Sequence, residues 1–390
     1  MRVLRASLLC LTLVLSGCDR LEFEALKLYL HFNQNLKIED GKHYFESGEG
    51  VYSVSAVYEG LEFPWDMAFL SESEILVTEK PGRLTKIDLD TRETQSISGV
   101  PVVSFSGQGG LLGIALHPNF QVNQLIYLSY TASVESGENQ IQLLKARLVD
   151  NMLLDPEIIF RALPVVEGLS NLGGALAIDP IGSIYLSVGE HQSRDNLQSR
   201  RSHLGTIIRL NDDGSIPGDN PFVQHTNSYP EIYSYGHRNP QGMTIDPTNN
   251  SLWAVEHGPK GGDELNVIRA GKNYGWPMVS YGTEYDGSAF AHTGPEGMFE
   301  EPLVYYKQSI APAGLLFYSG EKYPDWKDHF LIGSLIGTHV NLVGLKHGAI
   351  EKERLLGDLK MRIRGLRLSP EGHITILTEN GIILRVEKEG

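Results

Sequence analysis

Apolar and polar residues alternate with a period of two over most of the chain from about residue 51 onward. Such alternation is typical of β-strands with one buried face, and the apolar spacing of long helices is scarce here. Gly, Asp, Asn and Pro separate the alternating runs, as expected for turns between strands. The pattern therefore predicts an all-β fold of short strands.

The strand pattern repeats six times along the chain. Each repeat has a small residue, an alternating apolar run and a second strand-like run, and the repeats occupy residues 64–80, 113–130, 175–190, 242–258, 314–335 and 365–381. Their starts are 49, 62, 67, 72 and 51 residues apart, a spacing that suits propeller blades of several short strands. Six repeats predict a six-bladed β-propeller over residues 51–390. An array of β-sandwiches without ring closure is the alternative.

A propeller must close its ring, and the segment before the first repeat can do so. VYSVSAVYE, residues 51–59, is a strand that belongs to no repeat, and it can pair beside IILRVE, residues 382–387, in the last blade. Residues 18–50 are more polar and show no repeat. We expect them to form an N-terminal spacer.

The first 17 residues differ from the rest and predict export. Arg2 and Arg5 precede an apolar run over residues 6–15, which is too short for a permanent membrane anchor but typical of a cleaved signal peptide. The run ends in LSGC, which resembles the lipobox of bacterial lipoproteins, so we expect Cys18 to be lipidated. The protein is then periplasmic and lipid-anchored to a bacterial membrane. An ordinary signal peptide with a chance cysteine is the alternative.

Cysteine content and charge narrow the function classes. The chain has only Cys10 and Cys18, so the folded body has no thiol for a disulfide framework, a metal site or a nucleophile. The net charge is −15, and loss of Arg2 and Arg5 with the leader makes it more negative. An acidic protein of this kind disfavours nucleic acid and suits divalent cations.

Four loops beside the repeats carry candidate ligand-binding residues. They are GQGGLL (107–112), YGHRNPQG (235–242), EHGPKGGDELN (256–266) and KMRIRG (360–365). Arg238, Arg362 and Arg364 offer planar forks of donors that suit carboxylates, and Asn239 adds a donor and an acceptor. Three arginines on repeat-opening loops indicate a multiply anionic ligand, although each alone could form a surface salt bridge.

The loop EHGPKGGDELN has the composition of a cation site. Its glycines allow unusual backbone angles, so that Gly258 and Pro259 can offer carbonyls, while Asp263 and Glu264 offer carboxylates. Hard cations such as calcium favour these oxygen ligands. The spacing does not match an EF-hand, and a solvated acidic turn is the alternative.

Several long motifs resemble those of one enzyme family. They are GQGGLLGIALHPNF, GTIIRLNDDGSIPGDNPF, YSYGHRNPQGM, EHGPKGGDELN, KNYGWP and RIRGLRLSPEG. In this order they resemble the soluble aldose sugar dehydrogenases that use pyrroloquinoline quinone (PQQ), from about residue 60 to the C-terminus. The resemblance implies a six-bladed propeller, in agreement with the repeat count.

The resemblance also implies roles for individual residues. PQQ is a tricarboxylate, which would account for the arginines. The positions that match the family's cofactor-binding residues are Arg238, Asn239, Arg362 and Arg364. Those that match calcium ligands are Gly258 and Pro259, at the calcium that bridges to PQQ, and Asp263 and Glu264, at a second, structural calcium. Gln108 matches a residue that lines the active site.

Other positions depart from the family pattern. The histidine that takes the sugar's hydroxyl proton is replaced by Asn171 in SNLGGA, and a carboxamide cannot serve as a general base. The arginine that follows is replaced by Ala175, and the cofactor-binding lysine is replaced by Ile336. His191, in VGEHQ, could supply the missing base, or it could be a loop histidine with no catalytic part. His237 and His117 are expected to be structural.

Two functions follow from these residues. The first is PQQ- and calcium-dependent oxidation of aldoses at C1 to lactones, in which His191 or a bound water removes the proton and electrons pass to a quinone or similar acceptor. The second is a catalytically inactive, lipid-anchored propeller that binds a sugar, a cell-wall fragment or a protein partner. Asn171 and Ile336 favour the second, whereas the retained arginines and cation loop favour the first.

Overall fold

The computed structural model describes residues 41–134, 137–194, 197–346 and 349–389, which all belong to one compact unit. The expected signal peptide, Cys18 and most of the expected spacer lie outside these residues. None of the described helices is long and apolar enough to cross a membrane.

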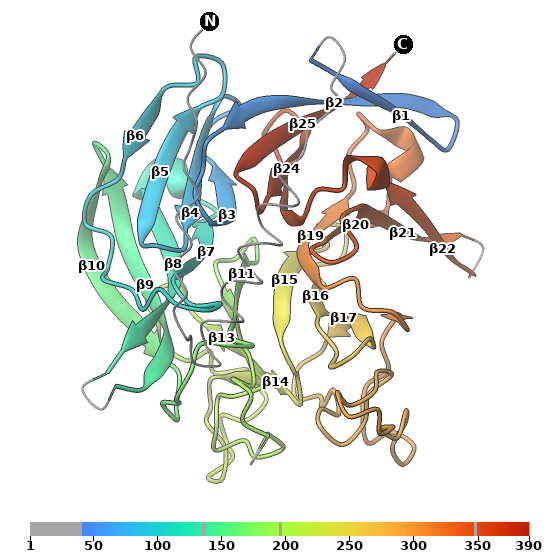
Figure 1. The fold of residues 1–390 in the computed structure, drawn as a ribbon. Helices are drawn as coiled ribbons and strands as arrows, with labels where there is room; N and C mark the ends of the chain where they lie inside the picture. The colour runs from blue at the N-terminus through green and yellow to red at the C-terminus, as the bar shows by residue number, and fades with distance from the viewer. Residues whose placement is uncertain (1–40, 135–136, 195–196, 347–348, 390) are drawn as a thin grey trace, which may run out of the picture. The chain divides into compact units, whose positions relative to one another are not determined.

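Six antiparallel sheets follow one another along the chain as the blades of a propeller (Figure 1). Blade 1 consists of β3 (Pro64–Phe69), β4 (Glu74–Glu79), β5 (Arg83–Asp88) and β6 (Thr94–Ser96). Blade 2 consists of β7 (Leu111–Leu116), β8 (Leu125–Ser133), β9 (Asn139–Val149) and β10 (Met152–Arg161). Blade 3 consists of β11 (Gly173–Ile178), β12 (Ile184–Val188), β13 (Thr206–Leu210) and β14 (Ile232–Tyr235).

The remaining blades repeat this order. Blade 4 consists of β15 (Pro240–Ile245), β16 (Leu252–Glu256), β17 (Asp263–Ile268) and β18 (Val304–Tyr306). Blade 5 consists of β19 (Pro312–Tyr318), β20 (His329–Ser334), β21 (Val340–Lys346) and β22 (Ala349–Leu355). Blade 6 contains β23 (Ile363–Leu368), β24 (Ile374–Thr378) and β25 (Ile382–Glu389). The described helices are single turns: α2 (Phe120–Asn123), η1 (Pro324–Trp326) and η2 (Gly357–Leu359). The predicted all-β, six-bladed fold is confirmed.

Blade 6 closes the ring with strands from the other end of the described chain. β2 (Gly50–Glu59) pairs with β25 in an antiparallel register that runs from Val51 opposite Glu389 to Glu59 opposite Ile382 (Figure 1). The predicted closing strand is therefore confirmed. β1 (His43–Ser47) adds a fifth strand beside β2, so this part of the segment expected to be a spacer belongs to the sheet.

Aromatic side chains fix β1 and β2 to blade 5 as well. Tyr52 stacks on Trp326 of η1 with ring centroids 4.4 Å apart, and its hydroxyl donates to Asp325 at 2.6 Å. The Trp326 indole N–H donates to Ser47 at 2.8 Å. Large buried aromatic rings contribute strongly to packing, so the two strands anchor the seam of the ring.

We call β3, β7, β11, β15, β19 and β23, each the first strand of its blade, the inner strands. Each of them pairs irregularly at its start. The register between the first and second strand of each blade shifts near Pro64, Leu111, Gly173, Pro240, Pro312 and Ile363. Such bulges re-aim side chains and are common next to functional sites. We call the end of the ring where the inner strands begin the front end, and the opposite end the back end.

Candidate functional site

The bulged positions of three blades place large side chains at the front end. Trp65, Gln241 and Arg364 follow the first residues of β3, β15 and β23. The Arg364 guanidinium carbon lies 4.6 Å from the Trp65 ring centroid, and its Nη1 donates to Gln241 Oε1 at 2.9 Å. Burial lowers the pKa of Arg364 to about 10, and Arg362 adds to this effect. Gln241 and Trp65 are neutral, so among the described residues its charge lacks a bonded carboxylate.

Hydrogen bonds extend from Arg364 across to blades 3, 4 and 5. Gln241 Nε2 donates to Asn239 Oδ1 at 3.4 Å, and the same oxygen accepts from the backbone N–H of Gly173 at 3.0 Å. Asn239 Nδ2 lies 3.4 Å from His257 Nδ1, and His257 Nε2 lies 2.9 Å from the carbonyl of Pro312. The predicted residues Asn239 and Arg364 thus belong to one buried polar network.

Arg238 is the second buried guanidinium. Its Nη1 donates to the carbonyls of Gly258 at 2.8 Å and His257 at 3.3 Å, and its Nε is buried without a partner. The guanidinium carbon lies 5.4 Å from the Trp276 ring centroid. Its carboxylate neighbour, Glu256, accepts from the backbone N–H of Arg238 at 2.7 Å, not from the guanidinium. An arginine held by carbonyls and a ring is ready to pair with an anionic ligand.

Arg362 differs because it already has a carboxylate partner. Its Nε pairs with Glu379, and its Nη1 donates to the carbonyl of Leu335 at 3.2 Å. Burial opposes ionisation of Glu379, but Arg362 and Arg364 together hold the pKa of this carboxyl below its usual range. Ile336, next to Leu335, leaves 63% of its side chain exposed at this corner.

The residues at the expected proton-transfer position lie together between blades 2 and 3. Gln108 Oε1 accepts from the backbone N–H of Asn171 at 2.9 Å, and Asn171 Nδ2 donates to Glu190 Oε1 at 2.7 Å. His191 donates its backbone N–H to the carbonyl of Asn171 at 3.0 Å. Both ring nitrogens of His191 are buried without partners among the described residues, and burial lowers the pKa of the ring to about 4.

Glu190 is a residue that the sequence reasoning missed. Its Oε2 is buried and has no partner, although its Oε1 accepts from Asn171. A buried carboxylate oxygen with no donor is costly unless a ligand or water reaches it. The acidic residue beside His191 in VGEHQ was the available signal.

Asp263 shapes the glycine-rich loop from inside. Its Oδ1 accepts from the backbone N–H of Gly258 at 2.9 Å. Its Oδ2 accepts from the Ser309 hydroxyl at 2.9 Å and from the backbone N–H groups of Ile310 at 2.7 Å and Ala311 at 2.9 Å. These bonds fix the loop that carries Gly258 and tie it to the start of blade 5.

Glu264 lies in a different environment from Asp263. Asn266 Nδ2 donates to Glu264 Oε2 at 3.0 Å and to Glu256 Oε1 at 3.1 Å, so the two carboxylates lie close together. Burial raises the pKa of Glu264 to about 8, and the charge of Glu256 adds to the shift. A cavity of about 20 Å³, lined by both carboxylates and by Arg238, Gly258 and Ser280, lies beside them. Two facing carboxylates in a small buried space suit a bound cation.

Two further histidines discussed in the sequence analysis, His237 and His117, lie among hydrogen-bond partners. His237 Nδ1 lies 3.0 Å from Glu256 Oε1, and its Nε2 lies 2.9 Å from the Ser234 hydroxyl. His117 Nδ1 accepts from the backbone N–H of Asn119 at 2.9 Å. Both are engaged in local hydrogen bonds, as expected for structural residues.

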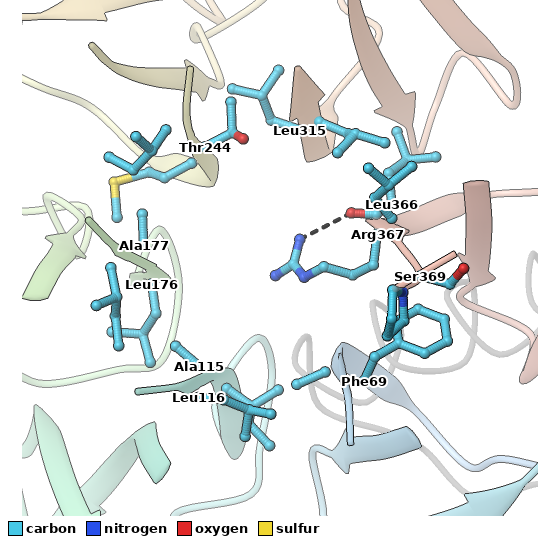
Figure 2. Close-up of a pocket in the computed structure, with 18 residues that line it drawn as sticks. Phe69, Ala115, Leu116, Leu176, Ala177, Thr244, Leu315, Leu366, Arg367 and Ser369 are labelled. Carbon is cyan, nitrogen blue, oxygen red and sulfur yellow. Dashed lines mark hydrogen bonds between the residues drawn. The ribbon is translucent and has the colours of Figure 1, made fainter. Parts of the chain in front are cut away.

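The back end of the ring is chemically different. A cavity of about 500 Å³ opens where the inner strands end, lined mainly by apolar side chains such as Leu176, Leu315 and Leu366 (Figure 2). Arg367 extends across this opening, where it donates to the carbonyl of Leu366 at 3.0 Å and pairs with Asp66. Asp66 compensates the charge of Arg367, whereas Arg238 and Arg364 at the front end bond to neutral groups. The candidate site is therefore the front end.

The sequence matches the family described as Glucose / Sorbosone dehydrogenase over residues 61–385. The chain belongs to the glucose/sorbosone dehydrogenase family. It is 36% identical over 342 residues to aldose sugar dehydrogenase YliI of Escherichia coli strain K12, covering 86% of this chain and 92% of that protein.

Solved structures of the glucose/sorbosone dehydrogenase family have the same fold. The apo crystal structure of the soluble aldose sugar dehydrogenase from Escherichia coli superposes with a TM-score of 0.83 at 35% identity, covering 87% of this chain and 100% of that one. The PQQ-bound aldose sugar dehydrogenase from Streptomyces coelicolor superposes with a TM-score of 0.70 at 29% identity, covering 88% and 100%. The family resemblance stated from the motifs is confirmed.

Proposed function

We propose that this protein oxidises aldose sugars at C1 to lactones with PQQ and calcium. The observation that carries the proposal is the pair of buried guanidiniums at the front end. Arg238 and Arg364 each bond to neutral groups, and unpaired buried charges are costly. A polycarboxylate ligand would compensate both. The relative that binds PQQ has the same fold, which supports this choice of ligand.

Each part of the front end has a task in this proposal. Arg238, Arg362 and Arg364 would bind the carboxylates of the cofactor, and Asn239 would fix its orientation through the polar network. The carbonyls of Gly258 and Pro259 are suitable oxygen ligands for calcium. When bound, PQQ supplies a two-electron acceptor and calcium makes it more electrophilic. The final electron acceptor would be a quinone or a similar compound.

His191 is proposed to accept the proton of the sugar hydroxyl. Asn171 stands where the resemblance places a histidine base, and it cannot take this role. The backbone N–H of His191 donates to the carbonyl of Asn171, and neither nitrogen of its ring has a partner among the described residues. With a pKa of about 4 it is neutral at physiological pH, and the neutral imidazole has one accepting nitrogen. Glu190, with its unpartnered oxygen, is the competing acceptor.

A second calcium is proposed at Glu264. Its carboxylate and that of Glu256 face each other beside the small cavity. A divalent cation there would offset their mutual repulsion. The carboxylate of Asp263 accepts four hydrogen bonds, so its part in this site would be to hold the loop.

The alternative is a catalytically inactive, lipid-anchored propeller that binds a sugar, a cell-wall fragment or a protein partner. Asn171 and the exposed Ile336 favour it, because the first cannot act as a base and the second cannot pair with a carboxylate.

Spectroscopic titration distinguishes the two functions. The purified protein is mixed with calcium and PQQ, and the absorbance of the cofactor is followed before and after aldoses are added, with a dye as acceptor. Reduction of bound PQQ by aldoses and bleaching of the dye are expected. Binding without reduction would favour the inactive propeller, and absence of binding by the wild-type protein would contradict the cofactor site.

The proton acceptor is identified in the same assay. His191→Asn should lower turnover by about 10²- to 10⁴-fold with cofactor binding retained, whereas Glu190→Gln should retain turnover. The reverse result would assign the proton to Glu190.

Anchoring at Cys18 belongs to the same proposal, because it would hold the enzyme at the membrane that carries its electron acceptor. Labelled fatty acid should enter the wild-type protein and not Cys18→Ser. Equal labelling of the two proteins would exclude lipidation at this residue.

A further inference from the structure

Lys80 and Ile336 occupy similar positions in two different blades. Lys80 directly follows β4, the second strand of blade 1, and Leu335 and Ile336 follow β20, the second strand of blade 5. The inner strand of blade 6, β23, lies between those of blades 5 and 1. The arginines of blade 6 are therefore flanked by Ile336 on one side and by Lys80 on the other.

The ammonium of Lys80 bonds to the loop that precedes blade 2, at the front end of the ring. Its Nζ donates to the carbonyl of Gly107 at 2.9 Å and lies 5.9 Å from the Phe105 ring centroid. Burial, and then the positive charge of Arg364, lower the pKa of Lys80 to about 8, and Glu379 opposes this shift. The lysine bonds to a neutral carbonyl and shares its surroundings with Arg364 and Glu379.

The charges at this corner do not balance. Asp66 is already paired with Arg367 of the back end, and Glu379 is paired with Arg362. Among the residues that the structure describes, Lys80 and Arg364 then have no bonded carboxylate, so two positive charges remain in a partly buried space. Such an excess destabilises the unliganded state and favours an anion. Because Lys80 lies near Arg364, this anion would bind at the front end, where the candidate site lies.

We propose that Lys80 binds a carboxylate of the polycarboxylate cofactor, from the side of the arginine pair opposite to Ile336. This inference rests on the proposed function. It means that loss of the family's lysine at Ile336 does not leave the cofactor without an ammonium partner, because blade 1 supplies one in place of blade 5.

Titration calorimetry of the full chain with PQQ in the presence of calcium tests this role. Lys80→Met and Lys80→Gln should each weaken PQQ binding by roughly 10- to 100-fold, the usual effect of one charge-assisted contact, and Lys80→Arg should restore most of the affinity. Lys86→Met is the matched control, because Lys86 lies on β5 and pairs with Glu74. It should bind PQQ as the wild-type protein does.

The pH dependence of PQQ affinity gives a second readout that a purely structural role would not change. Lys80 is protonated below pH 8, and a bound carboxylate would raise its pKa. Wild-type affinity should therefore be full below pH 8 and fall as the pH rises above it. The measurement is confined to pH 7 to 9, where Arg364, with a pKa of about 10, and Glu379, with a pKa below its usual range, keep their charges. Lys80→Met should lack the decline.

The outcomes separate this inference from the proposed function. Wild-type binding with unchanged affinity in both Lys80→Met and Lys80→Gln would overturn the role of Lys80 alone, as would an unchanged pH profile. Absence of PQQ binding by the wild-type protein would overturn both. Circular dichroism of each variant checks that it is folded.

Discussion

Asn171 and His191 have the same unusual backbone conformation at the centre of the candidate site. Their φ angles are +50° and +52°, in the left-handed region that side chains adopt rarely and that Asn, Asp and His tolerate best. A hydrogen bond from the backbone N–H of His191 to the carbonyl of Asn171 joins the two positions. The strain supports a functional role for this corner, since strained residues often gather at active sites.

The buried, neutral His191 makes stability depend on pH. Its pKa is about 4 in the folded protein and about 6.5 when unfolded, so the unfolded chain binds the extra proton between these values. Stability should fall as the pH is lowered from 6.5 to 4, by on the order of 3 kcal/mol from this group. His191→Asn keeps a side chain that tolerates the conformation and removes the titration.

Urea unfolding at several pH values measures this contribution. The difference in unfolding free energy between wild type and His191→Asn should change across this window and stay constant above pH 7. His257 is also buried and has a lowered pKa, but it is present in both proteins and cancels in the comparison. A difference independent of pH would show that the pKa of the His191 ring is the same in the folded and the unfolded protein.

Sequence reasoning expected several of these residues to lie at one end of the ring but could not give their partners. Arg238 and Gly258 were both predicted, and they are joined by a hydrogen bond. Lys80 and Glu190 were missed, because a lysine before a proline and a glutamate before a histidine look ordinary in a sequence. Their roles depend on residues that are distant in the sequence and near in the fold, such as Arg364 in the case of Lys80.

At the scale of elements, the bulge at the start of each inner strand decides what the front end presents. Blades 1, 4 and 6 place Trp65, Gln241 and Arg364 directly after the first residue of the inner strand, and blades 2, 3 and 5 place the smaller or apolar residues Leu112, Gly174 and Ala313 there. A period of two predicts strands but not the residue at which the register shifts. The repeat count was therefore predictable, whereas the convergence of these three side chains was not.

The loop between β16 and β17 depends on close backbone packing. A Cβ atom at Gly258 would lie 2.1 Å from the carbonyl oxygen of Gly261, and Gly262 has a φ of +73°. Such contacts leave room only for glycine. Asp263 completes the loop by accepting from Gly258 and from the start of blade 5.

Asp263→Asn should therefore destabilise the protein. An amide nitrogen in place of Oδ2 would face the backbone N–H groups of Ile310 and Ala311, and unsatisfied buried donors cost on the order of 3 kcal/mol together. Chemical denaturation should show this loss, and PQQ affinity should fall as the Gly258 loop loosens.

Asp88→Asn is the control for this substitution. One oxygen of Asp88 accepts from the backbone N–H groups of Asp90 and Thr91 in an exposed turn, and an amide oxygen can do the same, so little change is expected. Equal effects of the two substitutions would contradict the special role of Asp263.

At the scale of the whole propeller, blade 6 joins distant parts of the chain. The alternating run at residues 51–59 was sufficient to predict the closing strand, because a ring needs a partner for β25. β1 was not predicted, because its five residues form no repeat and the contact of its Ser47 with Trp326 depends on the folded ring.

Deletion of β1 and β2, the two strands that complete blade 6, should open the ring. Removing residues 1–59 would leave the edge of β25 unpaired and expose the aromatic rings around Trp326, so the remaining chain is expected to aggregate or to lose its cooperative thermal transition. Removing residues 1–40 alone should preserve the melting temperature. Size-exclusion chromatography and thermal melts of the two truncations compare them, and a stable monomer without β1 and β2 would refute the stabilising role of the seam.

The seam also brings the two ends of the described propeller within reach of each other. Lys42 Nζ lies 2.8 Å from Glu389 Oε1 and 3.1 Å from Glu387 Oε2. A short engineered linker could therefore connect them, and a circularly permuted chain could start at an exposed turn such as the one between β5 and β6. Such a permutant would begin far from the seam and would hold the strands of blade 6 together by a covalent link.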